Sequence, residues 1–144
     1  MINNRKAWAW MIFGVYGLVM LWLLFGQRWG QNAGSINTKL FDTVQRYIWV
    51  LKHSREELQI RHAVINLAGN VVMFVPLGFL APCIWVKLRK FGWHFLYMVL
   101  IIVSVEVLQL ITLLGSCDVD DLLLNLVGTT IGFGAWKILG RKIK

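Results

Sequence analysis

The stretch FLYMVLIIVSVEVLQLITLL, residues 95–114, decides the fold class of this chain. About 20 apolar residues cross roughly 30 Å of hydrocarbon as an α-helix, so this stretch predicts a transmembrane helix. Its strongest polar interruptions are Glu106 and Gln109, which lie three residues apart and therefore on one helical face. A carboxylate inside a bilayer costs roughly 2.5–3.5 kcal/mol or more. We therefore expect Glu106 to face the interior of a helix bundle.

Three further apolar runs accompany this stretch, at residues 8–25, 66–86 and 122–139. The 144-residue chain is 58% hydrophobic and its mean hydropathy is +0.62. Soluble domains contain about 45–50% apolar residues, so a soluble fold is disfavoured. The sequence predicts an all-α, polytopic membrane bundle of four transmembrane helices, built as a single integral membrane domain over residues 1–144.

The net charge of +8 is distributed in a way that favours a membrane topology. Lys and Arg fall mainly near both termini and in the short 87–90 loop between two apolar runs. Cytoplasmic loops are enriched in these residues, so we expect both termini in the cytoplasm and the acidic 115–121 loop outside. A nucleic-acid partner is not expected, because such binding needs a clustered basic face.

The long connection before the second apolar run contains an amphipathic pattern. Its apolar positions recur at helical spacing: Leu40, Phe41, Val44, Tyr47, Ile48 and Leu51. Charged and polar residues fill the other face, which predicts an amphipathic interfacial helix lying in the plane of the membrane surface. This helix either caps the bundle or gates access of a ligand, and amphipathicity alone does not choose between these roles.

Polar side chains from three predicted helices share one depth, in the outer half of the membrane. They are the candidate ligand-binding residues: Asn66, Asn70, Glu106, Gln109, Asp118, Asp120, Asp121 and Asn125. Intramembrane ionisable groups often mark functional sites. The alternative is structural, since amides connect transmembrane helices through hydrogen bonds and Asp118 or Asp120 can cap a helix. We expect Asn70, Glu106 and Asn125 to converge.

Other residues are predicted to shape the helices. Gly128 and Gly132 form a small-xxx-small pair that permits close helix contact. Pro76 removes a backbone donor and is expected to kink its helix. Cys83 and Cys117 lie too far apart along the predicted bundle for a disulfide, and we expect two free thiols. No His and Cys spacing typical of a metal site occurs, and no cofactor is expected.

Three motifs resemble those of VanZ-like proteins. They are Asn, Asn, Phe, Pro and Gly within NLAGNVVMFVPLG at 66–78, Glu-x-x-Gln at 106–109, and Asp-Asp, Asn, Gly, Gly between 118 and 132. The resemblance covers a core of residues 62–136. It implies that Gly78, like Pro76, Gly128 and Gly132, has a structural role in the helices. It implies a multi-pass protein of the bacterial cell membrane. The founding member of that family confers low-level resistance to the glycopeptide teicoplanin.

The chain departs from that family pattern at one point. Many VanZ-like proteins have an arginine in the loop before the first aspartate, where this chain has Gly115, Ser116 and Cys117. If that arginine contacts an anionic group, Arg61 is a candidate to replace it.

Three functions follow from these features. The first is a non-enzymatic envelope protein that binds a membrane lipid or lipid-linked molecule in the outer leaflet and alters glycopeptide susceptibility. The second is an intramembrane enzyme in which Glu106 is a general base and the three aspartates at 118–121 hold Mg²⁺ or Ca²⁺. The third is a small transporter, which without an inverted repeat needs to form a homo-oligomer. The first is favoured, because no catalytic motif is present.

Overall fold

A computed structural model describes residues 4–26 and 35–140. Four of its helices are long and apolar enough to span a membrane. They are α1 (Asn4–Leu21), α3 (Glu57–Ile84), α4 (Phe91–Ile111) and α5 (Val119–Leu139). At its end, α1 continues into a short π-helix, η1 (Trp22–Gly26). A shorter helix, α2 (Asp42–His53), precedes α3, and a 3-10 helix, η2 (Val86–Arg89), connects α3 to α4. The predicted all-α class with four candidate spans and one amphipathic helix is confirmed.

The helix α3 begins at Glu57, well before the apolar run predicted to start at 66. Its 28 residues extend over about 42 Å at ~1.5 Å per residue, which exceeds the ~30 Å of a hydrocarbon core. The predicted start at residue 66 was wrong because Glu57, Gln59 and Arg61 end the apolar run in the sequence, although the helix itself continues through them. The helix also runs through Pro76 as one element.

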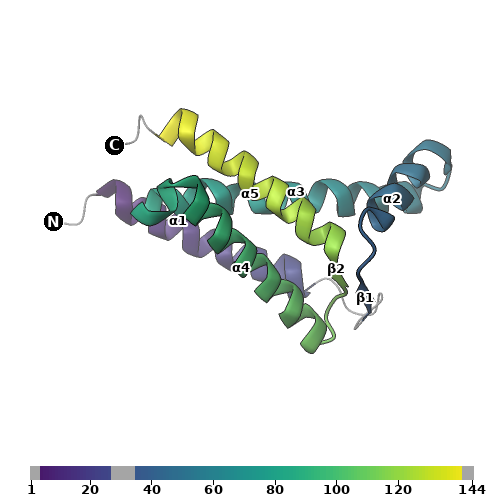
Figure 1. The fold of residues 1–144 in the computed structure, drawn as a ribbon. Coiled ribbons are helices and arrows are strands. Elements are labelled where there is room, and N and C mark those ends of the chain that lie inside the picture. The colour runs from purple at the N-terminus through teal and green to yellow at the C-terminus, as the bar shows by residue number, and fades with distance from the viewer. Residues whose placement is uncertain (1–3, 27–34, 141–144) are drawn as a thin grey trace.

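The first turns of α3 form an antiparallel hairpin with α2, which we call the α2–α3 hairpin (residues 42–66). Ser54 at its tip donates to Gln59 at 3.0 Å, and Asn66 further along donates to Tyr47 at 3.0 Å. Figure 1 shows this hairpin projecting from one end of the molecule, away from α1 and α4. The amphipathic segment predicted from the sequence is therefore one arm of a hairpin.

The closest helix pair is α3 and α5, which approach backbone to backbone. A Cβ added to Gly128 would overlap the carbonyl oxygen of Val71, and one added to Gly132 would overlap that of Val75. From the other helix, a Cβ on Gly78 would overlap the backbone of Thr129. The small residues thus permit the close contact that small-xxx-small spacing favours.

The remaining helices pack around this pair. Met20 and Leu24 join Phe74 of α3 and Ile102 of α4 in one buried hydrophobic cluster. The hydroxyl of Tyr16 in α1 donates to the carbonyl oxygen of Met73 at 2.7 Å. In Figure 1, the start of α1 and the end of α5 lie at the same end of the bundle, opposite the α2–α3 hairpin.

Two very short strands join distant parts of the chain, which the sequence did not predict. Strand β1 (Ile36–Asn37) pairs in parallel with β2 (Cys117–Asp118), in the register Ile36 with Cys117 and Asn37 with Asp118. This pairing connects the segment before α2 to the segment before α5.

Candidate functional site

Asp118 anchors the start of α5 to two other elements. It is the N-cap of α5, and its Oδ1 accepts the backbone N–H of Asp120 at 2.9 Å. Such a cap satisfies one of the free donors in the first turn of a helix. Its Oδ2 accepts the hydroxyl of Thr43 at 2.6 Å and the side-chain amide of Asn37 at 3.3 Å. Of the two candidate caps, Asp118 is therefore the N-cap.

Asp120 caps α2 from a different helix. Phe41, the N-cap residue of α2, has a left-handed backbone with φ of 63° and no side-chain cap. The carboxylate of Asp120, which is 0% exposed, accepts the backbone N–H of Phe41 at 2.6 Å and that of Val44 at 3.1 Å. A carboxylate at this position also complements the positive end of the helix dipole. The start of α2 is thus held by α5.

The remaining carboxylates connect α3, α4 and α5. Glu106 is only 4% exposed, and its Oε2 accepts the backbone N–H of Asp118 at 3.4 Å. The side-chain amide of Asn70 donates to Oδ1 of Asp121 at 2.5 Å. Side chains from three helices therefore meet at the first turn of α5, and we call Asn70, Glu106, Asp118, Asp120 and Asp121 the polar layer.

Two of the predicted site residues bond outside the polar layer. The amide of Asn66 donates to Tyr47 on α2, within the α2–α3 hairpin. The amide of Gln109 donates to the carbonyl oxygen of Leu24 in η1 at 3.1 Å. These two residues hold α2 and η1 to the neighbouring spans.

Asn125 lies one turn after Asp121 and is 2% exposed. Its Oδ1 has no hydrogen-bond partner in the part of the chain that the structure describes. Asn70, Glu106 and Asn125 are all buried, on three different helices. Their mutual convergence stays a prediction.

The aspartates do not form a metal site among residues 4–26 and 35–140, where no group of three or more His, Cys, Asp or Glu is arranged to hold an ion. The carboxylate of Asp118 is bonded to Thr43, that of Asp120 to backbone N–H groups of α2, and that of Asp121 to Asn70. The Mg²⁺ or Ca²⁺ arrangement considered for these acids is thus absent from this geometry.

Several residues that complete this arrangement were not found from the sequence. Thr43 and Asn37 reach Asp118 only through folding of the long connection, and no local pattern marks them. Arg46 also reaches these contacts, because its Nη2 donates to the hydroxyl oxygen of Thr43 at 3.5 Å. Arg61, the candidate suggested by the missing loop arginine, is exposed on α3.

Comparison with known proteins identifies the family. A family model described as VanZ/LLP1 matches residues 9–140. The chain belongs to the VanZ/LLP1 family. The match extends well beyond the 62–136 core that carries the three motifs. No curated protein and no solved structure matches this VanZ/LLP1 chain.

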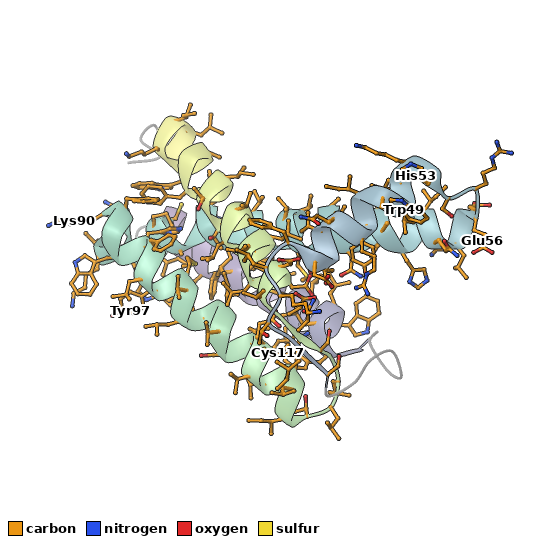
Figure 2. The ribbon with its side chains drawn as sticks, turned by 45° about the vertical axis from the view of Figure 1, so that its right-hand side comes forward. Trp49, His53, Glu56, Lys90, Tyr97 and Cys117 are labelled. Carbon is orange, nitrogen blue, oxygen red and sulfur yellow. The ribbon has the colours of Figure 1, made fainter. Side chains whose placement is uncertain are left out.

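Both cysteines of this VanZ/LLP1 protein are free, as predicted, and both are half-buried. Cys117, labelled in Figure 2, lies in β2 between α4 and α5 and directly precedes Asp118 of the polar layer. Burial raises the pKa of its thiol, and the nearby charges of Glu106 and Asp118 raise this pKa further. The thiolate is the reactive form, so Cys117 reports on the charge of the polar layer.

This position gives a first test of the polar layer in a Cys83→Ser background. We expect Cys117 to react slowly with a maleimide at pH 7, and faster as the pH rises, because its pKa is raised. Replacing Glu106 with Gln should speed the reaction at pH 8, because one cause of the raised pKa is removed. The matched change Glu57→Gln, at an exposed acid on α3, should leave the rate unchanged. Equal rates for Glu106→Gln and the parent would contradict a charged Glu106 beside Cys117.

Proposed function

We propose that this protein binds a membrane lipid or lipid-linked envelope molecule at the outer leaflet, and that this binding alters susceptibility to glycopeptides such as teicoplanin. The observation that carries the proposal is the anchored α2–α3 hairpin, which is fixed to α5 through the polar layer. The hairpin supplies the exposed surface that we propose binds the ligand, and the polar layer supplies the buried acids that hold the hairpin. The bacterial origin, the outward orientation and the effect on teicoplanin are parts of this proposal.

The exposed surface of the α2–α3 hairpin suits an amphiphile. Trp49 and Leu58 are 60% and 66% exposed, and the ring of Trp49 stacks on His53 at 5.0 Å. Figure 2 shows Trp49 and His53 near the tip of the projecting hairpin, together with Glu56. Lys52 and Arg55 add exposed positive charge at the same tip. Indole rings favour membrane interfaces, and cations attract phosphate groups. In this proposal Lys52 and Arg55 therefore contact the phosphate of the ligand, while the exposed acids Glu56 and Glu57 balance the charge of the tip.

The bonds within the polar layer support binding over catalysis. The carboxylates of Asp118 and Asp120 accept hydrogen bonds that position α2. A carboxylate committed to two such donors is well suited to positioning a binding element. In this proposal Asp118 and Asp120 are positioning residues. Glu106, which is 4% exposed, acts on the hairpin through the backbone N–H of Asp118 and does not touch the ligand.

The experiment compares Glu106→Gln with the parent in a deletion strain and with purified protein. The variant keeps a side-chain oxygen that can accept the backbone N–H of Asp118, but it loses the negative charge of the carboxylate. Because hydrogen bonds to charged groups contribute about 1.5–3 kcal/mol, we expect binding of an undecaprenyl-linked probe to weaken roughly tenfold. We also expect the variant to fail to restore the parental teicoplanin susceptibility.

The control is Asp42→Asn, which removes an exposed acid at the start of α2, away from the hairpin tip. It should behave as the parent in both assays. Unchanged probe binding and unchanged susceptibility with Glu106→Gln would overturn the proposed site. Turnover of the labelled probe that is lost in Asp120→Asn would instead favour an enzyme, and uptake into proteoliposomes would favour a transporter.

A further inference from the structure

One buried titratable residue has no role in the polar layer or in the α2–α3 hairpin. His94 lies in the first turn of α4 and is 1% exposed. Neither of its ring nitrogens has a hydrogen-bond partner in the part of the chain that the structure describes. The backbone carbonyl of Thr129 in α5 lies beside the ring, but not in the geometry of a hydrogen bond. Buried polar groups are normally paired, so this imidazole requires an explanation.

The ring of His94 packs α4 onto α5. Its centroid lies 4.5 Å from that of Phe133. The ring of Phe133 in turn packs against Phe91 of α4 at 5.6 Å and against Trp136 of α5 at 5.5 Å. We call these four residues the aromatic cluster. A phenylalanine at position 94 could fill the same place without burying two polar atoms, so packing alone does not account for a histidine here.

The charged side chains that flank the aromatic cluster on α5 and before α4 are positive. On α5, Nζ of Lys137 lies 5.8 Å from the centroid of the Phe133 ring. Three further cations directly precede α4, namely Lys87, Arg89 and Lys90. The neighbouring part of α3, residues 70–84, adds only the thiol of Cys83 as a titratable group. A proton on His94 would therefore add a charge of the same sign as those around it.

No Asp or Glu lies near the aromatic cluster. The nearest acid to His94 along α4 is Glu106, and the nearest acid to Phe133 along α5 is Asp121. Both separations are twelve residues, which is about 18 Å along a helix. The other five acids of the chain lie in the α2–α3 hairpin or at the start of α5. A protonated His94 would thus be a buried cation without a counter-charge.

Protonation is therefore incompatible with the packed position of this ring. Burying an unpaired charge is strongly unfavourable, and contact between an imidazolium and one aromatic ring recovers only a small part of that cost. The ring of Phe133 already has the cation of Lys137 over it. Water is close, because Lys90, four residues before His94, is exposed. On protonation, the imidazole must leave the aromatic cluster for water.

We propose that His94 is a proton-operated latch between α4 and α5. While neutral, it packs against Phe133 and holds the start of α4 to the end of α5. When it takes up a proton, it leaves the aromatic cluster and the two helices separate at this end. Histidine ordinarily changes charge between about pH 5 and 8, so the latch responds to mild acid. Figure 2 shows Lys90, at the start of α4, at the opposite end of the molecule from His53 and Glu56, so the latch is separate from the α2–α3 hairpin.

The test is hydrogen exchange of the purified full chain in detergent, read by mass spectrometry at about pH 8 and about pH 5.5. The rates are corrected for the pH dependence of chemical exchange. Because the open state binds one proton more than the closed state, opening should become about tenfold more favourable at ~pH 5.5, one unit below the ordinary histidine pKa of about 6.5. We expect this acceleration in peptides that cover residues 91–98 and 129–137, and not in α2.

His94→Phe should remove this acid response, because phenylalanine fills the same space and cannot take up a proton. Thermal unfolding at the higher pH verifies that the variant folds. The matched control is His62→Phe, which replaces an exposed histidine on α3 and should leave the parental response intact.

Equal exchange of the parent at the two pH values in these peptides would overturn the proposal, whether or not His94→Phe folds. An acid response that persists in His94→Phe would overturn it as well, as would a response spread equally over the whole chain. These variants differ from those used for the polar layer, so failure here leaves the proposed function untouched.

Discussion

Replacing Gly132 with alanine is expected to destabilise the protein more than any other single methyl group added to α5. The new Cβ would overlap the carbonyl oxygen of Val75 and lie 2.8 Å from the backbone nitrogen of Phe79. These are backbone atoms of α3, which cannot rotate away as a side chain can. Overpacking of this kind costs about 1–3 kcal/mol or more, so we expect a clear loss in thermal stability in detergent.

The control for this change lies two residues further along the same helix. A Cβ added to Gly134 meets nothing within 4 Å, so Gly134→Ala adds the same methyl group without a clash. Alanine in a helix interior is favoured over glycine by roughly 0.5–1 kcal/mol, so this variant should be at least as stable as the parent. Equal unfolding temperatures for Gly132→Ala and Gly134→Ala would show that α3 and α5 are not in backbone contact.

Replacing Asp120 with alanine should loosen the first turn of α2, which only the bond from Thr43 to Asp118 would then fix to α5. The change leaves the backbone N–H groups of Phe41 and Val44 without their acceptor. Two hydrogen bonds to a charged group are lost, each contributing about 1.5–3 kcal/mol. We expect hydrogen exchange at these two amides to accelerate strongly, and tryptic cleavage at Arg46 and Lys52 to begin under native conditions.

Asp42→Ala is the comparison for Asp120→Ala. Asp42 is also an acid at the start of α2, but it is exposed and belongs to the helix itself. Its loss removes only a favourable charge in the first turn, worth about 0.3–1 kcal/mol. If Asp42→Ala accelerated exchange as much as Asp120→Ala, the cap supplied by α5 would not be the main anchor of α2.

The membrane spans were predictable because hydrocarbon selects strongly for apolar helices. The run at 95–114 and its observed helix, Phe91–Ile111, overlap almost completely. The start of α3 was missed because its first turns extend beyond the apolar run and are supported by α2 rather than by lipid. Hydropathy detects only the part of a helix that lies in the hydrocarbon.

The candidate site was predictable in its members but not in its bonds. The burial of Glu106 follows from the cost of exposing a carboxyl group to lipid, and it is 4% exposed. The role of Asp120 could not be read from the chain, because the N–H groups that it accepts belong to a helix far away in sequence. A local pattern shows which residues are acidic, whereas long-range folding decides what they bond to.

The pairing of β1 with β2 has a consequence for biosynthesis. Ile36 leaves the ribosome long before Cys117, its strand partner, and before the aspartates that hold Thr43 and Phe41. The nascent chain therefore carries an α2–α3 hairpin that is not yet fixed to α5 until translation reaches the last span. We expect chains arrested after α4 to be cleaved in this hairpin by quality-control proteases faster than completed chains.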